Sequence, residues 1–250
     1  MSCYRADVAI ATLTPGSERV DPGPGPIVAS WLGRTDYRDG LALQKRLAAE
    51  RADGAIPDQL LLLEHPAVLT LGRSSDPAHV RADAETLARR GIEVVRVERG
   101  GEVTYHGPGQ LVAYPIVRLA DRGLMVRPLV RALEAALVST CATLGVAADR
   151  RDGHPGCWCD PDGADPRKIG ALGLRVERGV SFHGIALNVS VDLADFGLID
   201  ACGMPGVVST SIDRELGVGR PPSTDSVEEA ARIFAPAFAT AIGATLAIGD

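Results

Sequence analysis

The sequence contains few cysteines and no excess of basic residues. Five cysteines in 250 residues are too few and too scattered for a disulfide scaffold, and their number is odd. Unpaired thiols are typical of a reducing compartment, which predicts a cytoplasmic protein. The 26 basic residues are outnumbered by 32 acidic ones. This balance argues against a nucleic-acid-binding protein, which needs a basic face to meet phosphates.

Long apolar runs are also missing. The first ten residues, MSCYRADVAI, lack the basic stretch and extended hydrophobic region of a secretory signal. Residues 233–249 are uncharged, but proline, threonine and glycine interrupt this run, and it falls short of the roughly 20 apolar residues of a membrane span. We therefore expect a packed terminal helix followed by a strand or tail, and no membrane insertion.

Apolar residues nevertheless make up 46% of the chain, enough to build a sizeable core. Their spacing predicts helices over 35–52, 83–91 and 126–145 and a last helix that starts near Ser226. It predicts strands at 59–72 (two, joined at His65-Pro66), 92–99, 110–117, 168–176 and 180–190. Ser226 and Glu229 have the spacing of a helix-capping box. This order predicts a single α/β domain over residues 1–250, with helices packed on a mixed or antiparallel sheet.

The segment RGGEVTYHGPGQ (99–110) is unusually rich in glycine, with four glycines and a proline in twelve residues. Such a backbone turns sharply and can approach a ligand closely. Its exposed N–H groups suit an anionic or carbonyl oxygen, although a plain hairpin connection would also explain the glycines. The spacing matches neither a dinucleotide fingerprint nor a phosphate loop.

Two predicted strands carry polar side chains that are unusual inside a sheet. Lys168 opens KIGALG (168–173), and a buried lysine is costly unless it is paired, whereas a lysine at the strand end can reach water. His183 lies in SFHGIALN (181–188), where a satisfied core histidine and a catalytic one are both open interpretations. Gly184 and Ala186 in the same strand are small enough to leave room for a slender group beside the sheet.

The segment DACGMPG (200–206) places Cys202 in a loop of glycine and proline, where an apolar filler is out of place. A thiolate is a strong nucleophile when its pKa falls below the usual value of about 8.5, and a nearby ammonium favours the thiolate. The sequence has only two lysines, and Lys45 falls on a predicted surface helix, so Lys168 is the candidate cation. A Cys–Lys pair could also move the proton during acyl transfer.

Five segments combine into a specific pattern. LLLEHPAVLTLGR, RGGEVTYHGPGQLVAYPI, KIGALG, FHGIALNV and GLIDACGMPG occur in this order between Trp31 and Ile212. Together they resemble the lipoyl(octanoyl) transferase family, which moves an octanoyl group from acyl carrier protein to a lysine of lipoyl-domain proteins. Within the wider lipoate and biotin ligase superfamily, the Cys and Lys arrangement is similar to the octanoyl-transferring branch. The resemblance implies an α/β fold with a mixed sheet, a smaller second sheet and flanking helices.

The resemblance also implies roles for particular residues. Cys202 would be the acyl-thioester nucleophile, and Lys168 would lower its pKa and shuttle the proton. The implied substrate-binding residues are Arg99, Gly100, Gly101, Glu102, Val103, Thr104, Tyr105, His106, Ala171, Leu172, Gly173, Gly184, Ile185 and Ala186. From their size alone, Gly170, Gly173, Gly184 and Ala186 could shape an apolar slot for the acyl chain, so a bulky residue at Gly184 should block long chains.

Partners and cofactors follow from the same resemblance. The implied partners are octanoyl-acyl carrier protein and the lipoyl domains of 2-oxoacid dehydrogenase complexes and of the glycine cleavage H protein. The thioester donor supplies the driving force, so the reaction would need no cofactor, ATP or metal. Two alternatives stay open: an ATP-dependent lipoate-protein ligase of the same superfamily, and a non-catalytic acyl- or metal-binding protein with an inert Cys202.

The chain departs from the family pattern in two places. The proline- and glycine-rich stretch 15–27 reads as a surface insertion without an assigned role. In HPGCWC (154–159), Cys157 and Cys159 flank the aromatic residue where the family usually has apolar side chains. A zinc site with His154 and Asp160 is one interpretation, but the C-x-C spacing is tighter than zinc sites use, and we favour packing on a strand.

Overall fold

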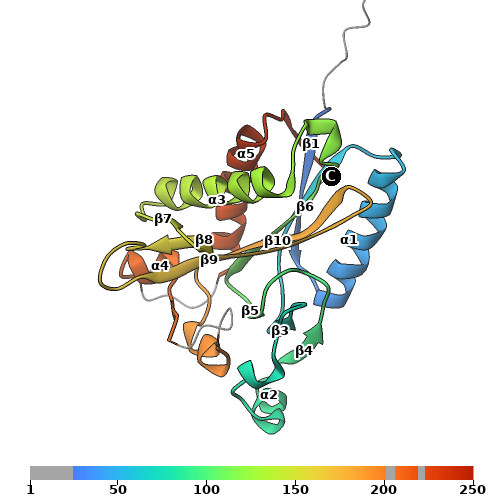
Figure 1. The fold of residues 1–250 in the computed structure, drawn as a ribbon. Coiled ribbons are helices and arrows are strands. Elements are labelled where there is room, and N and C mark those ends of the chain that lie inside the picture. Colours follow the sequence, from blue (N-terminus) through green and yellow to red (C-terminus); the bar gives the residue numbers. More distant parts are fainter. Residues whose placement is uncertain (1–24, 201–205, 219–222, 250) are drawn as a thin grey trace, which may run out of the picture.

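The computed structural model describes residues 25–200, 206–218 and 223–249, so most of the predicted insertion at 15–27 lies outside the described residues. Within these ranges the main feature is a mixed nine-stranded sheet (Figure 1). Its order is β12 (Leu246–Ile248), β1 (Ile27–Arg34), β2 (Asp58–Glu64), β6 (Gln110–Ile116), β10 (Val180–Asn188), β9 (Arg167–Glu177), β8 (His154–Cys159) and β7 (Asp149–Arg151), with β11 (Val208–Ser209) beside β9. The β1 strand runs parallel to β2 and β12, and the pairs from β2 to β7 are antiparallel. The predicted mixed sheet is therefore confirmed.

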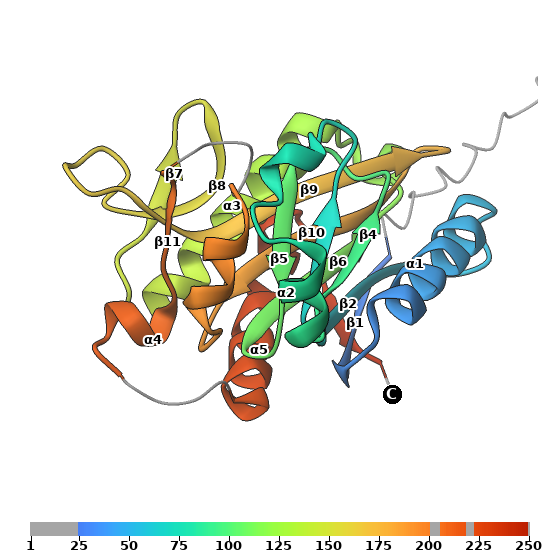
Figure 2. The ribbon, with the colours of Figure 1, turned by 90° about the horizontal axis from the view of Figure 1, so that it is seen from below.

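A second, three-stranded sheet lies below the main sheet in Figure 1 and stands in front of it in Figure 2. Its order is β4 (Glu93–Arg96), β3 (Val68–Leu71) and β5 (Val103–His106), and the short helix α2 (Ala84–Arg89) packs on it through Leu87. The two strands predicted within 59–72 thus belong to different sheets. Pro66 sits at the break between them, since proline lacks the N–H that a continuing strand would need.

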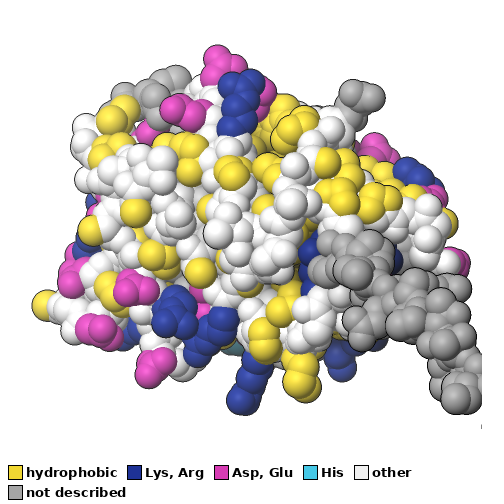
Figure 3. All heavy atoms as spheres, turned by 90° about the horizontal axis from the view of Figure 1, so that it is seen from above, with side chains coloured by type: hydrophobic (Ala, Val, Ile, Leu, Met, Phe, Trp, Pro, Cys, Tyr) yellow, Lys and Arg dark blue, Asp and Glu magenta, His cyan; other side chains and the backbone are white. Residues whose placement is uncertain are grey.

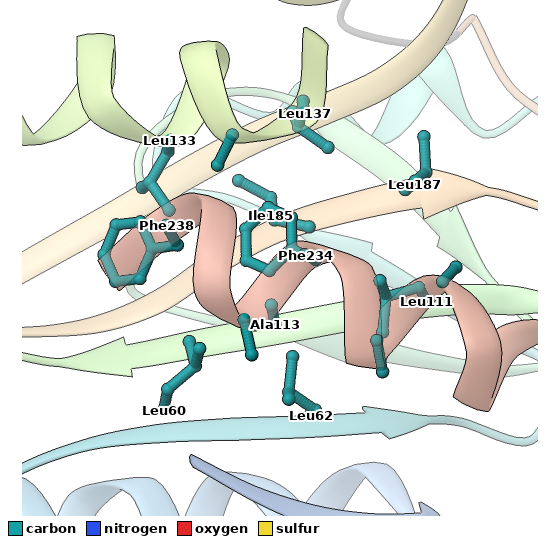
Figure 4. Close-up of a cluster of buried hydrophobic side chains, with 14 of the residues drawn as sticks. Leu60, Leu62, Leu111, Ala113, Leu133, Leu137, Ile185, Leu187, Phe234 and Phe238 are labelled. Atoms are coloured by element: carbon teal, nitrogen blue, oxygen red, sulfur yellow. The ribbon is translucent and has the colours of Figure 1, made fainter. Parts of the chain in front are cut away.

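Three long helices cover the two faces of the main sheet. The helices α3 (Val126–Thr143) and α5 (Thr224–Ala241) pack on one face, and α1 (Tyr37–Ala52) packs on the other. Side chains alternate along a strand, so in β2 Leu60 and Leu62 point to α3 and α5, whereas Leu61 and Leu63 point to α1. Figure 4 shows the first of these layers, with Phe234 and Phe238 of α5 against Leu60, Leu62, Ala113 and Ile185. Burial on both faces explains the unbroken apolar run of this strand.

The two carboxyl-proximal elements form as expected. The helix α5 and the strand β12 together account for the uncharged run at 233–249. None of the helices that the structure describes combines the length and hydropathy that a bilayer crossing needs. The outer surface on the α3 and α5 side mixes apolar, polar and charged side chains (Figure 3).

The last helix begins two residues before Ser226, so its predicted position holds but the predicted cap is wrong. The helix α5 begins at Thr224 with Ser223 at its N-cap, so Ser226 lies inside the first turns and is buried rather than capping the helix. Contacts distant in sequence set this start: the Ser223 N–H donates to Ser190 Oγ (3.0 Å), and Thr224 Oγ1 donates to Glu64 Oε1 (2.6 Å). A local capping signal was therefore overridden by tertiary hydrogen bonds.

Candidate active site

A cavity of about 270 Å³ lies where β9 and β10 of the main sheet meet the loop that leads into β5. Most of the predicted site residues line it: Arg99, Gly101, Glu102, Val103, Thr104, His106, Lys168, Ala171, Leu172, Gly173, Gly184, Ile185 and Ala186. These residues come from three separate segments of the sequence, which the pairing of β9 with β10 and the approach of the small sheet bring together.

Two predicted residues are not among those that line the cavity. The Gly100 N–H instead donates to the Leu174 carbonyl (2.9 Å), which fixes the loop to β9. Tyr105 points away from the cavity because strand alternation places it opposite Thr104 and His106. Its ring is buried in the small-sheet core, and its hydroxyl donates to Asp195 Oδ2 (2.7 Å). Burial, reinforced by this carboxylate, raises the pKa of Tyr105.

The glycine-rich loop is held from both sheets. Arg99 is buried, and its Nη2 donates to the carbonyl (2.7 Å) and to Oγ1 (2.9 Å) of Thr70 on β3. At the other end of the loop, the Gly109 N–H donates to Oε2 of the buried Glu64 on β2 (3.0 Å). The loop thus spans the gap between the sheets with its ends fixed, which positions the cavity wall before any ligand arrives.

The cavity also contains residues that the sequence analysis missed. Tyr37, Tyr114, Gly153, His154 and Pro155 line it, together with His183, whose role was left open. A tyrosine within the buried apolar run QLVAYPIV was a usable signal for Tyr114, because its hydroxyl needs a partner inside the core. Tyr37 gave no comparable signal, since it sits at the start of a helix that looked merely amphipathic.

Aromatic rings and histidines form one end of the cavity. His65 lies 5.0 Å from Tyr37 and 5.9 Å from both His106 and Tyr114, measured between ring centroids. The Thr35 carbonyl accepts from His65 Nδ1 (2.7 Å), so His65 Nε2 accepts from the Tyr114 hydroxyl (2.8 Å). Burial lowers the pKa of His65 to about 4, which keeps the ring neutral at physiological pH.

A chain of hydrogen bonds links His106 to the strand beside Lys168. His106 Nδ1 donates to Gln110 Oε1 (2.7 Å), and Gln110 Nε2 donates to Asn188 Oδ1 (2.9 Å). Asn188 Nδ2 in turn donates to the carbonyl of Thr210, and the Thr210 N–H donates to the Lys168 carbonyl. Burial lowers the pKa of His106 to about 3, so Nε2 of this residue acts as a hydrogen-bond acceptor.

His183 has an unusual backbone for a strand residue. Its φ is +56°, a conformation that non-glycine residues rarely adopt, and its N–H donates to Gln44 Oε1 (2.8 Å). Its Nε2 is buried and has no hydrogen-bond partner among the described residues. Burial also lowers the pKa of His183 to about 4. His183 is therefore not a satisfied core histidine, because its backbone is strained and its buried Nε2 has no partner among the described residues.

The three depressed histidine pKa values predict a loss of stability in acid. An unfolded histidine titrates near 6.5, so below that pH the unfolded chain binds protons that His65, His106 and His183 reject in the folded state. Stability is therefore full above about pH 6.5 and falls as the pH drops toward 4. We expect urea unfolding at pH 5 to show a free energy lower by about 1–2 kcal/mol for each of the three histidines than at pH 7.5.

A single substitution measures how much His183 contributes to this loss of unfolding free energy in acid. His183→Asn keeps a side chain that tolerates positive φ but does not titrate, so it should reduce the loss between pH 7.5 and pH 5 by about a third of its size. An unchanged pH dependence in this variant would contradict the assignment.

The predicted glycine slot needs correction. A Cβ on Gly184 would lie 2.0 Å from the carbonyl oxygen of Ala113 and 2.8 Å from Pro115 Cδ, and one on Gly173 would lie 2.8 Å from the Gly100 carbonyl oxygen. These glycines let neighbouring backbone approach closely; the space that a side chain would need is already filled. A bulky residue at Gly184 would push β10 away from β6 rather than fill the cavity. Apolar surface on the cavity comes instead from residues such as Pro155, Ala171 and Ala186 and from the ring of Tyr37.

Gly184→Ala is therefore expected to destabilise the fold. Overpacking of a buried site typically costs 1–3 kcal/mol, and a contact with a strand carbonyl gives little room for relaxation, so we expect a loss of about 3 kcal/mol in urea unfolding. Gly197→Ala is the matched control, because nothing lies within 4 Å of the added Cβ. Equal stability of the two variants would refute the close-approach explanation.

Lys168 lies at the start of β9 and is buried, with 7% of its surface exposed. It lines the cavity, and its Nζ lies 5.1 Å from the centroid of the Trp158 ring. Of the two positions considered for Lys168, the structure therefore shows the buried one, and the side chain does not extend into water.

The predicted nucleophile, Cys202, lies outside the described residues, so its role stays a prediction. The described chain on either side of it borders the site. Ser209 pairs with Lys168 across β11 and β9, and the Asp200 N–H donates to the His79 carbonyl (2.8 Å). His79 in turn contacts the cavity residue Glu102 through Nδ1 and Oε2 (3.2 Å).

The cysteines of HPGCWC are core residues. Cys157 and Cys159 are buried with Cys141 in the main hydrophobic cluster, as the packing interpretation predicts. Burial raises the pKa of Cys159 to about 12, and contact with Cys141 together with burial raises the pKa of Cys157. Zinc binds thiolates, so thiols with raised pKa values are poor ligands. Among the described residues, no group of three or more His, Cys, Asp or Glu side chains is arranged to hold a metal ion.

This architecture is shared with solved structures. The chain superposes on an archaeal bipartite lipoate protein ligase from Thermoplasma acidophilum with a TM-score of 0.64 and 16% identity, covering 90% of this chain and 87% of that chain. At this identity the match establishes the fold alone, and that fold is the one used by lipoate protein ligases. The predicted combination of a mixed sheet and a smaller second sheet agrees with it.

Sequence comparison is more specific. Residues 36–238 match the lipoyl protein ligase A/B catalytic domain, and the chain belongs to this family. It is 46% identical to an octanoyltransferase of Acidobacterium capsulatum, over 83% of this chain and 88% of the relative. It is 48% identical to an octanoyltransferase of Syntrophobacter fumaroxidans, over 74% of this chain and 79% of the relative. The resemblance drawn from the sequence motifs is confirmed.

Proposed function

We propose that this protein is an acyltransferase that moves an octanoyl group from octanoyl-acyl carrier protein to a lysine of a lipoyl domain. The observation that carries the proposal is the similarity to octanoyltransferases at 46–48% identity over most of the chain. The cavity supports it, because apolar side chains line a space that also contains a buried lysine. Lipoyl domains of 2-oxoacid dehydrogenase complexes and of the glycine cleavage H protein are the proposed acceptors, in the cytoplasm.

In the proposed first half-reaction, Cys202 attacks the thioester of the donor. Its proton passes to Lys168, and the thiolate adds to the carbonyl carbon to give a tetrahedral oxyanion. The carbonyl re-forms, the carbon–sulfur bond to the carrier breaks, and the carrier thiolate takes the proton from Lys168. The products are an octanoyl thioester on Cys202 and a free carrier thiol.

In the proposed second half-reaction, the acceptor lysine attacks the thioester on Cys202. Its neutral amine adds to the carbonyl carbon, and Lys168 accepts the proton that the amine loses. The bond to Cys202 breaks, and the sulfur leaves as a thiolate beside the Lys168 ammonium. The resulting amide is more stable than the thioester, which draws both steps forward without ATP.

The geometry around Lys168 supports this pairing. Ser209 on β11 lies directly opposite Lys168, and Cys202 is seven residues before it in the sequence. Seven residues of extended chain span at most about 25 Å, so this separation is compatible with contact between Cys202 and Lys168. On its other side, Asp200 is held by His79, which contacts Glu102 of the cavity.

The test is transfer in the absence of ATP. When purified protein is mixed with octanoyl-acyl carrier protein and a lipoyl domain, we expect the lipoyl domain to become octanoylated. Intact-mass measurement should detect this product and a transient octanoyl adduct on the protein itself. Transfer that requires free octanoate and ATP would instead identify a ligase. An absence of both adduct and transfer would favour the non-catalytic acyl-binding alternative.

A further inference from the structure

We propose that Trp158 is a positioning residue that holds the Lys168 ammonium at the cavity wall through the face of its indole ring. This inference rests on the proposed function, because it assigns Trp158 a task only if Lys168 moves protons there. It also gives a role to HPGCWC, the segment in which the chain departs from the family pattern.

The pairing of β8 with β9 brings the two side chains together. Trp158 and Lys168 are direct partners across this antiparallel pair, so their side chains leave the sheet on the same face. The Lys168 Nζ lies 5.1 Å from the ring centroid, within the distance of about 6 Å at which an ammonium is attracted to the negative face of an aromatic ring. Tryptophan provides the strongest such attraction among the aromatic side chains.

The ring is fixed in place. Trp158 is 1% exposed, and its Nε1–H donates to the His154 carbonyl (3.0 Å), which sets the orientation of the indole plane. Cys157 and Cys159 on either side of it point to the opposite face of the strand, where they anchor β8 in the main core. An attraction to a ring held in this way favours a position of the Lys168 ammonium against its face.

The strand also makes room for the lysine. Gly156 has a φ of +126°, and a Cβ there would lie 3.0 Å from Lys168 Cε and 2.4 Å from the Gly170 carbonyl oxygen. Its N–H donates to Oε1 of the buried Glu134 on α3 (3.1 Å). Two residues of β8 thus contact Lys168: Gly156 leaves space for its aliphatic part, and the Trp158 ring attracts its ammonium.

Arg151 provides an internal comparison. Its Cζ lies 5.2 Å from the centroid of the same ring, but the side chain belongs to β7 and is not among the residues that line the cavity. If Trp158 acts by holding Lys168, loss of Arg151 should matter little to transfer, whereas weakening of the ring should matter.

The decisive experiment changes the electronics of the ring and leaves its shape nearly intact. The chain has two tryptophans, so fluorinated tryptophans incorporated into a Trp31→Phe background report on Trp158 alone. Successive fluorines weaken the negative face of the indole. We expect the rate of octanoyl transfer from octanoyl-acyl carrier protein to fall in step with fluorination, by about tenfold at full substitution. The lower arm of the pH–rate profile should shift toward higher pH, because the ammonium no longer favours the thiolate as strongly.

Substitution provides a second test with matched controls. Trp158→Phe should retain more activity than Trp158→Leu, because phenylalanine keeps a ring face and leucine keeps only apolar bulk. Two controls accompany these variants: Cys157→Ala changes the core position next to Trp158, and Arg151→Gln removes the second cation near the Trp158 ring. Neither control should shift the pH–rate profile. A fluorination series with constant rate and pH profile would overturn the role of Trp158 while transfer by the unmodified protein persists. Absence of transfer in the unmodified protein would instead count against the proposed function.

Discussion

Cys202→Ala is expected to abolish the octanoyl adduct and to lower transfer to a lipoyl domain by at least about a thousandfold. Removal of a covalent nucleophile leaves only the binding and positioning contributed by the rest of the site. In this chain those contributions are the loop fixed by Arg99 and Glu64 and the apolar lining of the cavity, none of which can carry an acyl group. The measurement is intact-mass detection of the adduct, followed by single-turnover transfer.

A matched control distinguishes loss of the nucleophile from loss of any thiol. Cys157→Ala removes a buried core thiol whose pKa is raised, so it should lower stability but leave the adduct in place. An undiminished adduct on Cys202→Ala would remove Cys202 from the mechanism. Peptide mapping of the adduct would then show which side chain carries the acyl group.

Lys168→Ala should lower the rate of adduct formation at neutral pH by about a hundredfold to ten-thousandfold, the range that a proton-transferring side chain contributes. The deficit should shrink as the pH rises past about 8.5, because the thiol then ionises without help. The rate of adduct formation should be measured for Lys168→Ala and the unmodified protein from pH 6.5 to pH 10. Urea unfolding at pH 6.5 and at pH 10 checks that both proteins are folded. The pH dependence separates a chemical role from mere packing, which would slow the reaction equally at every pH.

The second lysine of the chain serves as the control. Lys45 lies on α1 and forms an ion pair with Glu98 (2.8 Å), and it is not among the residues that line the cavity. Lys45→Ala should therefore leave both the rate and its pH dependence unchanged. A parallel loss in the two variants would indicate a general charge effect, and a pH-independent deficit in Lys168→Ala would contradict proton transfer by this residue.

Much of the fold was predictable from local pattern. The helix at 126–145 is found at Val126–Thr143, and Leu129, Leu133, Leu137 and Cys141 are fully buried on one face, as their spacing of four predicts. Strands at 168–176 and 180–190 pair as neighbours. Apolar periodicity reports which face of an element is buried, and that information is carried within a few residues of sequence.

The site was only partly predictable. The glycine loop and the KIGALG and FHGIALN strands stood out because their composition is unusual for buried strands, and the cavity forms among them. Tyr37 was missed because it looks like an ordinary helix residue until the fold brings its ring to His65. Tyr114 was missed although its place in a buried apolar run was a usable signal. Gly184 of β10 was identified for the wrong reason, since only the approach of the Ala113 carbonyl shows that it serves strand contact.

The sequence by itself determined the long helices, several of the strands and the segments that line the cavity, because propensity and periodicity are local properties of the chain. The strand β1 was not predicted. The tertiary structure alone decided which of these segments meet: β2 and β3 pass to different sheets within four residues, and Trp158 lies opposite Lys168 only through the register of β8 on β9. The local pattern limits which face of a strand is buried. The partner of each strand and the sheet order depend on contacts between residues far apart in sequence.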